Sequence, residues 1–226
     1  MTEEWETKMG RVLPILFNTD MVLAILDDRK TNTRRILKFP KHIQKQENGL
    51  YTLFTEGTCY ENQHLEEIVN YIKPPYQPGN ILYVRETWVQ IKDVPQWEKF
   101  HRPNGHPISP EEYIYKADNV KVDGILPEIK WHPSIHMPKD AARIWLRVTD
   151  VRVERLQDID DEGAKAEGAN WHNGKHVGFE EKMNRSAIDR FKEIWNSTIK
   201  PGNRNKYGWG ANPWVWVIEF ERCEKP

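Results

Sequence analysis

The chain has little cysteine, and it lacks any long hydrophobic run. Cys59 and Cys223 are its only cysteines among 226 residues, and two thiols without a secretion signal are typical of free cysteines in a reducing cytoplasm. No run approaches the roughly 18 apolar residues of a membrane span, and the acidic, polar residues 1–5 differ from a signal peptide. We therefore expect a cytoplasmic protein with no membrane partner.

An excess of charge of either sign is also missing. The 33 lysines and arginines nearly balance the 34 aspartates and glutamates, which gives a formal net charge of -1. Non-specific binding of long polyanions requires the neutralisation of many phosphates, so this balance argues against a general nucleic-acid binder and is compatible only with a local basic patch. With 30% charged and 38% hydrophobic residues, the chain suits a globular protein that buries a core.

Three common catalytic signatures are absent. The chain contains no G-x-x-x-x-G-K-S/T, G-x-G-x-x-G or G-x-S-x-G pattern, so nucleotide triphosphatases, dinucleotide enzymes and α/β-hydrolases lack support. His132 and His136 have a spacing that ligates zinc on a helix, but Pro133 and Pro138 disfavour a helix there and no cysteine pair is near. We expect no metal site and no cofactor.

Strand and helix patterns follow one another irregularly along the chain. Strand patterns cover residues 12–17, 33–37, 50–60 as a hairpin around Glu56-Gly57, 81–89, 113–115, 143–156 and 214–220. Helix patterns cover residues 21–26, 65–72, 160–168 and 186–195. This arrangement favours the α+β class. We expect one domain over residues 1–226, a small, mostly antiparallel β-barrel with flanking helices and insertions at about 38–79 and 90–140.

The run Lys30-Thr31-Asn32-Thr33-Arg34-Arg35 is the clearest candidate for chemistry. It puts an amine, two hydroxyls and two guanidinium groups at a helix-to-strand corner. A threonine hydroxyl becomes a nucleophile when a base takes its proton, and a lysine is such a base only as the neutral amine. Burial and neighbouring cations lower a lysine pKa, so Lys30 and Thr33 are a candidate pair. A solvated basic turn is the alternative.

Two further segments are candidates for the site. Glu167 lies late in a short helix beside Gly168, where its carboxylate can relay a proton; the alternative is a surface glutamate. The loop at 203–210 interleaves basic and aromatic residues, which suits stacking on a base and contact with phosphate. An exposed turn or a lid is the alternative for this loop.

The pattern Asp28-x-Lys30-x-x-Thr33-x-Arg35 resembles the G-x-K-x-x-x-x-R signature of the ASCH domain family, a branch of the PUA-like superfamily. Lys30 and Arg35 match, and Asp28 stands at the family's glycine position. Similar pieces are Pro78-Gly79-Asn80-Ile81-Leu82, the helix at 160–168 and the strand at 215–220. The insertions resemble those of the larger ASCH proteins of phages and prophages. The resemblance implies a PUA-like barrel.

One branch of this family, the bacterial N4-acetylcytidine amidohydrolases, is similar at a G-R-K-T-x-T-x-R run. Residues 28–35 match that run at every specified position but the glycine. The resemblance implies that Lys30, Thr33 and Glu167 form a catalytic triad of base, nucleophile and proton relay. It implies a metal-independent enzyme without a cofactor, whose substrate is a small N4-acylated cytosine nucleoside.

The substrate on this hypothesis lies against Arg35, Arg34, Tyr83 and Trp88. An arginine stabilises the oxyanion of acyl transfer, and an aromatic ring stacks on the pyrimidine. The alternative is an RNA or modified-base binding module, or a ribonuclease, in which the basic run at 30–38 contacts phosphate; a phage structural role is a further alternative. The sequence leaves the acyl group and the oligomeric state open.

Overall fold

The structure is a computed structural model that describes residues 10–38, 43–55, 57–95, 97, 109–118, 129–169 and 186–226. Its elements are those of an α+β protein with mostly antiparallel sheets and few helices. Contacts divide the chain into two compact units, each assembled from segments that are distant in sequence. Unit 1 consists of Met1–Asp28, Ile81–Arg147 and Arg222–Pro226, and unit 2 consists of Arg29–Asn80 and Val148–Glu221.

Unit 1 contains strands in the order β1-β6-β9, of which β9 continues into unit 2. These strands span Val12–Leu16, Ile81–Arg85 and Trp145–Arg155. β1 pairs in parallel with β6, and β6 pairs antiparallel with the start of β9. A separate antiparallel pair joins β7 (Trp88–Gln90) to β8 (Tyr113–Tyr115). The strand expected over 81–89 is therefore divided in two.

The first helix, α1, covers the expected range 21–26 and begins two residues earlier. It spans Thr19–Leu26, and the side chain of Asn18 caps it by accepting a hydrogen bond from the Met21 N–H at 2.9 Å. Val22 and Ile25 are buried on one face of the helix. The short amphipathic pattern thus forms a helix because one stripe of apolar side chains enters the core of unit 1.

A buried carboxylate in unit 1 is paired with an arginine that reaches the surface. Glu86 is 1% exposed, and its carboxylate accepts two hydrogen bonds from the Arg143 guanidinium at 2.9 and 3.0 Å. Arg143 also donates to Asp118, and its guanidinium lies 4.0 Å from the centre of the Tyr115 ring. The Tyr115 hydroxyl in turn donates to the Ala141 carbonyl. These contacts satisfy polar groups that the core of this unit buries.

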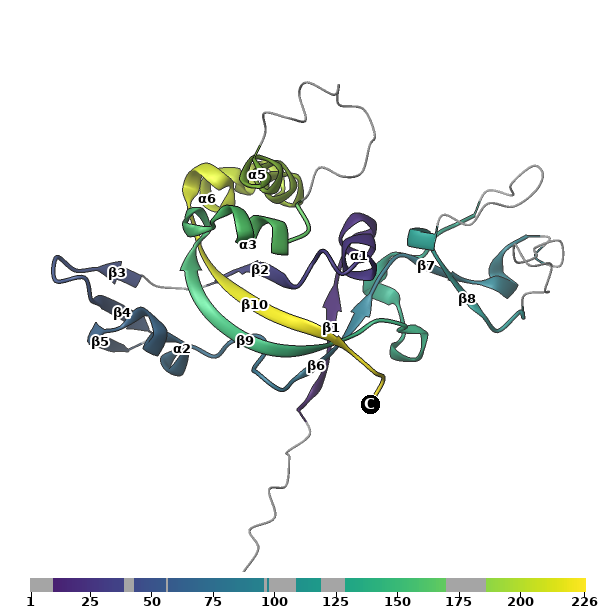
Figure 1. Cartoon of the computed structure of the whole chain (residues 1–226), viewed down its shortest axis with the longest axis horizontal. Helices are drawn as coiled ribbons and strands as arrows, with labels where there is room; N and C mark the ends of the chain where they lie inside the picture. The colour runs from purple at the N-terminus through teal and green to yellow at the C-terminus, as the bar shows by residue number, and fades with distance from the viewer. Residues whose placement is uncertain are drawn as a thin grey trace, which may run out of the picture. The chain divides into compact units, whose positions relative to one another are not determined.

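Unit 2 contains the rest of β9 together with β10 and β2, in the order β9-β10-β2. β10 (Trp214–Cys223) pairs antiparallel with β2 (Asn32–Ile36). Helices α3 (Asp161–Ala166), α5 (Ala187–Thr198) and α6 (Arg204–Tyr207) lie together on one side of β9 and β10 (Figure 1). One face of these strands is therefore covered by helices.

The core of unit 2 lies between this strand face and α5. Val215 and Val217 share one face of β10, and both belong to one apolar cluster with Phe191 and Trp195 of α5. Ser186 caps α5 by accepting a hydrogen bond from the Asp189 N–H. The helix predicted after Ser186 is confirmed.

The segment between β2 and β6 forms a small sheet of its own, with the order β3-β4-β5. These strands span Ile43–Lys45, Tyr51–Thr55 and Thr58–Gln63. The predicted hairpin is confirmed: Gly57 has a φ of +87° in its turn, while Glu56 lies outside the described residues. A 3-10 turn at Leu65–Glu67 and the helix α2 (Ile68–Tyr71) follow.

Short 3-10 helices connect many of these elements. They span Ile91–Asp93, Lys116–Asp118, Ser134–His136, Lys139–Ala141, Leu156–Asp158, Pro201–Asn203 and Trp209–Ala211. Most of them lie in the two segments expected as insertions or near the ends of long strands. Parts of the second insertion, at 98–108 and 119–128, lie outside the described residues.

The expected α+β class and antiparallel character are confirmed. The strand pairs of the described residues do not include one that closes a barrel, so the barrel stays a prediction. The expectation of a single domain with two insertions also stays a prediction. The β1–β6 pair is parallel, an exception that the strand patterns did not indicate.

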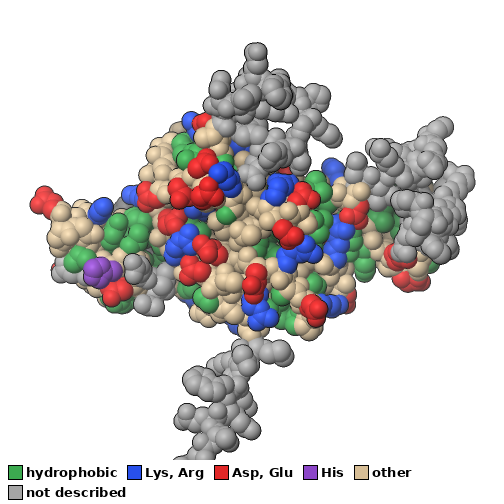
Figure 2. Space-filling view, in the orientation of Figure 1, with side chains coloured by type: hydrophobic (Ala, Val, Ile, Leu, Met, Phe, Trp, Pro, Cys, Tyr) green, Lys and Arg blue, Asp and Glu red, His purple; other side chains and the backbone are tan. Residues whose placement is uncertain are grey.

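The surface carries charges of both signs. Acidic and basic side chains are interspersed over the face seen in Figure 2, in keeping with the nearly balanced composition. Within the described ranges, the structure contains no helix with the length and apolar character that crossing a membrane requires.

Candidate active site

The corner between α1 and β2 contains a residue in the left-handed conformation. Asp27 closes α1 with an ordinary φ of -86°, whereas Asp28 has a φ of +55°. Glycine adopts positive φ readily, and aspartate tolerates it better than most residues. Asp28 thus adopts the backbone conformation that favours glycine, the residue of the ASCH signature, and its carboxylate contacts Arg222 at 3.3 Å.

Lys30 is buried against the end of α3. It is 3% exposed, and its backbone forms an isolated antiparallel bridge with Glu167. Its Nζ donates hydrogen bonds to Glu167 Oε2 at 2.6 Å, to the Glu167 carbonyl at 3.0 Å and to the Asn32 carbonyl at 2.7 Å. An ammonium group has three protons, so these bonds use all three. The alternative of a solvated basic turn therefore does not hold at Lys30.

Glu167 is held in place by the way α3 ends. Asp160 caps the start of α3 through the Gly163 N–H, and Glu167 closes the helix as its C-terminal cap. Gly168 follows with a φ of +82°, the left-handed conformation with which helices often end. The Glu167 side chain is consequently directed to Lys30 and is 5% exposed.

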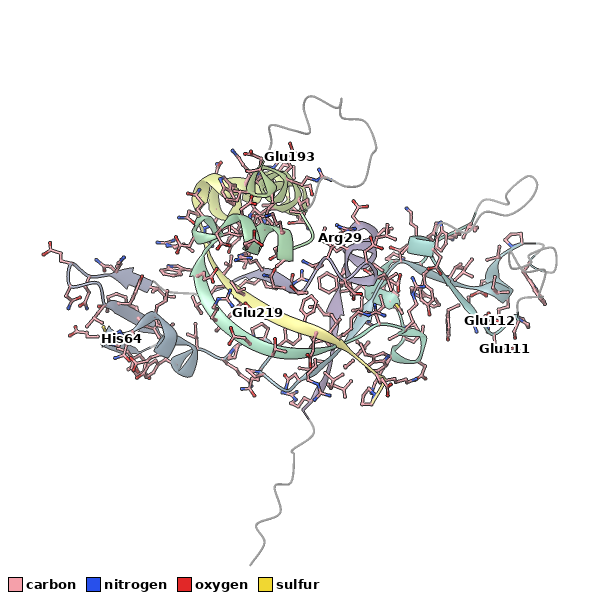
Figure 3. All side chains as sticks on the ribbon, in the orientation of Figure 1. Arg29, His64, Glu111, Glu112, Glu193 and Glu219 are labelled. Atoms are coloured by element: carbon pink, nitrogen blue, oxygen red, sulfur yellow. The ribbon has the colours of Figure 1, made fainter. Side chains whose placement is uncertain are left out.

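Arg34 joins Glu167 to a second carboxylate. Its guanidinium lies 3.4 Å from Glu167 Oε1 and 3.1 Å from Glu154 Oε2, and the residue is 6% exposed. Glu154 also accepts from Arg152, which contacts Glu219 of β10, labelled in Figure 3. Arg34 therefore orients the Glu167 carboxylate from the side opposite Lys30 and is buried among protein groups.

Electrostatic effects act on the pKa of Lys30 in both directions. Burial lowers the pKa of Lys30 from its ordinary value, because water no longer solvates the ammonium charge. The contact with Glu167 opposes this change, whereas the positive charges of Arg35 and Arg34 lower the pKa further. The direction is the one that a general base of this residue type needs.

Thr33 lies on the opposite face of β2 from Arg34. Neighbouring side chains alternate along a strand, so Thr33 and Arg35 share one face while Asn32 and Arg34 share the other. Thr33 is 4% exposed and stands opposite Ile218 of β10. Among the described residues, no hydrogen bond joins its hydroxyl to Lys30. The structure thus brings Lys30 and Glu167 together but does not show the contact between nucleophile and base.

A cavity of about 460 Å³ opens on the Arg35 face of unit 2. Arg35 and Lys38 line one side of it, Trp216 of β10 lines it as well, and Lys73 and Tyr76 come from the segment after α2. The sequence analysis did not single out Trp216, Lys73 or Tyr76 as site residues. The alternation of β10 was a usable signal, because Trp216 points away from the face that Val215 and Val217 bury.

Tyr83 and Trp88, the expected stacking residues, belong to unit 1. The ring of Tyr83 lies 6.0 Å from that of Trp145, and the ring of Trp88 lies 5.0 Å from that of His132 and 5.5 Å from that of Tyr113. Each ring therefore packs within its own unit, and a stacking role for either stays a prediction. His132 pairs with Trp88 through its backbone as well.

The basic and aromatic loop after α5 is tied to that helix. The Trp195 indole donates to the Tyr207 carbonyl at 2.8 Å, and the Asn196 side chain accepts from the Trp209 N–H at 2.9 Å. The Trp209 ring packs edge-on against Phe191. The loop thus completes the core of unit 2, and a role at a binding site stays a prediction.

Comparisons with protein-family models, with curated proteins and with solved structures give no match to this chain. The chemistry of the site is therefore argued from its own residues. Within the described part of the chain, no group of three or more His, Cys, Asp or Glu side chains has an arrangement that holds a metal ion.

Proposed function

We propose that this protein hydrolyses the amide of N4-acylated cytosine nucleosides, with Thr33 as nucleophile, Lys30 as base and Glu167 as proton relay. The observation that carries the proposal is the buried 2.6 Å contact between Lys30 and Glu167, which are 137 residues apart in sequence. A lysine with a lowered pKa beside a carboxylate is a pair that exchanges protons. We also propose membership of the ASCH family, with a PUA-like barrel, which the left-handed Asp28 supports.

The reaction begins with a proton transfer inside the pair. When the proton shared by Lys30 and Glu167 moves to the carboxylate, the ammonium becomes a neutral amine and the carboxylate becomes an acid. Burial favours this uncharged arrangement, because it removes two charges from a site with little solvent. The amine then has a lone pair with which to accept the Thr33 proton.

Acylation follows from that state. The Thr33 oxygen attacks the acyl carbon and its proton passes to Lys30. Arg35 lies on the same face of β2 and supplies positive charge to the oxyanion. The bond between the acyl carbon and N4 then breaks, and N4 takes the proton of Glu167. Cytidine leaves, and an acyl-threonine ester remains with an ammonium and a carboxylate.

Hydrolysis of the ester restores the starting groups. Glu167 takes a proton from water, whose oxygen attacks the ester carbon. The Thr33 oxygen leaves and receives the proton of Lys30. The carboxylic acid departs, and Lys30 and Glu167 return to the neutral amine and the acid. Every proton is accounted for by these three residues and water.

The test follows the loss of the acylated base by its ultraviolet absorbance. The purified full chain is expected to convert N4-acetylcytidine into cytidine and acetate. Thr33→Ala and Lys30→Met are expected to lower kcat/KM by about a hundredfold or more, because each removes a group of the covalent pathway. Thr31→Ala is the matched control, since Thr31 is an exposed hydroxyl two residues away. Full activity in both site variants contradicts the triad.

The binding-module alternative is disfavoured by burial. That function needs the basic run to contact phosphate, yet Lys30 and Arg34 are 3% and 6% exposed and both hold Glu167. Charges buried against a carboxylate do not neutralise a phosphate in solvent. Salt-dependent RNA binding without turnover of any acylcytidine supports this alternative over the hydrolase.

A further inference from the structure

The cavity beside Arg35 belongs wholly to unit 2 and has a marked charge. Three of its lining residues, Arg35, Lys38 and Lys73, are cations, and the described residues that line it do not include a carboxylate. Lys38 and Lys73 are exposed at the rim, whereas Arg35 is partly buried. A cluster of cations without an acid in a chain of balanced charge is a local attraction for an anion.

The inner part of the cavity is aromatic. Trp216 is 5% exposed and Tyr76 is partly buried, so most of each ring is already packed against protein. Burial raises the pKa of Tyr76, so its phenol is protonated at neutral pH and does not neutralise Arg35. Burial also lowers the pKa of Arg35, which means that a nearby anion relieves an unfavourable charge. The cavity thus offers rings inside and positive charge at its rim.

Strand geometry connects this cavity to the proposed nucleophile. Thr33 and Arg35 are two residues apart on one face of β2, which separates their Cα atoms by about 6.6 Å. Arg35 also interacts electrostatically with Lys30 and Glu167. A ligand that reaches from Thr33 past Arg35 arrives at the rim lysines. The volume of about 460 Å³ is within the range of small-molecule sites.

We propose that Lys38 and Lys73 bind the phosphate of a nucleoside monophosphate, so that the substrate is an N4-acylated cytidine nucleotide rather than the free nucleoside. The proposal names the substrate class of the site described above. Its prediction about catalysis therefore rests on the proposed function. The base lies toward Thr33 and the phosphate lies at the rim. The phosphate of a free nucleotide and that of an oligonucleotide share this chemistry, and a cavity of about 460 Å³ has the size of a site for a free nucleotide.

The first experiment compares kcat/KM of the full chain for three substrates. These are N4-acetylcytidine, its 5′-monophosphate and a short oligonucleotide that contains one N4-acetylcytidine. We expect a preference of about tenfold for the monophosphate over the nucleoside, which is the effect of two exposed charge contacts. The double variant Lys38→Gln, Lys73→Gln is expected to bring this ratio close to one. Lys45→Gln, an exposed lysine on β3 outside the cavity, keeps the wild-type ratio.

Equal kcat/KM for nucleoside and nucleotide overturns the inference and leaves the hydrolase proposal intact. A nucleotide preference that is unchanged in the double variant also overturns the inference and leaves the hydrolase proposal intact. A strong preference for the oligonucleotide over the monophosphate overturns the choice of a free nucleotide. A melting curve for each variant establishes that it is folded.

A binding measurement separates the two proposals if no substrate is turned over. Calorimetry then compares cytidine 5′-monophosphate with cytidine, on wild type and on the double variant. Tighter binding of the monophosphate, lost in the double variant and weakened by salt, supports the phosphate site while the hydrolase proposal fails. Equal affinity for the two ligands overturns both.

Discussion

At the residue scale, the pair of Lys30 and Glu167 has two arrangements of its proton. The charged arrangement gains from the 2.6 Å contact and from Arg34 beside the carboxylate. The neutral arrangement gains from burial and from the repulsion between Lys30 and the two arginines at 34 and 35. A lysine base must give up its proton before it can accept one, so the effects that lower the pKa of Lys30 assist this role and the contact with Glu167 opposes it.

The pH dependence of activity tests this balance. The reactive neutral pair holds the one proton that Lys30 and Glu167 share, so kcat/KM is expected to fall as pH rises through the pKa at which Lys30 loses that proton, and burial lowers this pKa below 10.5. In Glu167→Gln, Lys30 becomes neutral only by losing its proton, so the residual activity is expected to rise with pH instead. Its midpoint is expected at a lower pH than that of wild type, because Glu167 raises the pKa of Lys30. The same variant is expected to lower the plateau of kcat by about a hundredfold, since the leaving N4 loses its acid.

The control for this measurement is Glu162→Gln. Glu162 is an exposed carboxylate on α3, with a side chain that is 81% exposed, and it does not contact Lys30. Its removal is expected to leave the midpoint unchanged. A midpoint that moves to higher pH in Glu167→Gln contradicts the assigned electrostatics.

Residue patterns drew attention to Lys30 and Thr33 but gave no signal for the partner of Arg34 or for the residues that line the cavity. The Lys30–Thr33 pair was visible because its members are three residues apart in a basic run. Glu154 as the second partner of Arg34 was not predictable, because it lies 120 residues away and nothing in its own segment indicates a partner. Tyr76 and Lys73 were missed for the same reason, since only folding brings the segment after α2 to β2.

At the element scale, the end of α3 determines where the Glu167 carboxylate lies. Gly168 has a φ of +82°, so Gly168→Ala is expected to reduce the free energy of unfolding by about 1 kcal/mol. It is also expected to lower kcat/KM, because the strain acts on the residue that precedes it. Chemical denaturation and turnover of N4-acetylcytidine measure the two effects.

Gly49→Ala is the matched control for this element. Gly49 has nearly the same φ, +83°, in the turn between β3 and β4, and nothing lies within 4 Å of an added Cβ. We expect a similar loss of stability without a loss of activity. If Gly168→Ala and Gly49→Ala change activity equally, α3 does not position the carboxylate.

At the corner after α1, a substitution is expected to raise the stability of the protein instead of lowering it. Asp28→Gly removes a left-handed aspartate and is expected to stabilise the protein by about 1 kcal/mol, or about 2–4 °C in Tm. The ion pair with Arg222 that this substitution removes is exposed and contributes little. Asp27→Gly is the control, because Asp27 has a negative φ, so glycine relieves no left-handed strain there and adds unfolded-state entropy. A lower Tm for Asp28→Gly contradicts the assignment of strain.

Elements with strong local signals were predicted well. The helices after Asn18, Asp160 and Ser186 were expected from their patterns, and each of these side chains caps its helix by a hydrogen bond. The break between β6 and β7 was not, because 81–89 is apolar enough to read as one strand and only the fold shows that Glu86 is buried with Arg143. Local pattern therefore predicts where an element begins better than where tertiary contacts interrupt it.

At the scale of the whole molecule, each unit draws on distant parts of the chain. Unit 1 contains the first and the last residues as well as the middle segment Ile81–Arg147. Composition and pattern predicted the α+β class because they report local structure, whereas strand order depends on pairings across the whole chain. Neither unit is a continuous stretch that a truncation could isolate.

Stability at high pH provides a global test. Burial raises the pKa of Tyr115 to about 12, so above pH 10 the unfolded chain loses this proton before the folded protein does. Folded-state stability due to Tyr115 is therefore present below pH 10 and is lost as pH rises toward 12. The stability difference between wild type and Tyr115→Phe is expected to shrink by roughly 1 kcal/mol from about pH 9 to about pH 11.

Urea unfolding of both proteins at each pH measures this difference, and the subtraction removes the titration of groups that both share. Tyr113→Phe is a control on the same strand, since its phenol is less buried. A difference that grows with pH contradicts the assignment to Tyr115.

Side chains point alternately to the two faces of β2, so odd-numbered and even-numbered residues of the site lie on different faces. Odd-numbered Thr33 shares a face with Arg35, which lines the cavity, and even-numbered Asn32 shares a face with Arg34, which contacts Glu167 at the end of α3. A one-residue shift after Lys30 exchanges the two faces: a deletion places an arginine where the hydroxyl was, and an insertion places the hydroxyl at the position beside Glu167. Changes of two residues preserve the faces. Distant relatives of this protein are therefore to be sought by an odd spacing between the lysine and the hydroxyl, whatever residues lie between them.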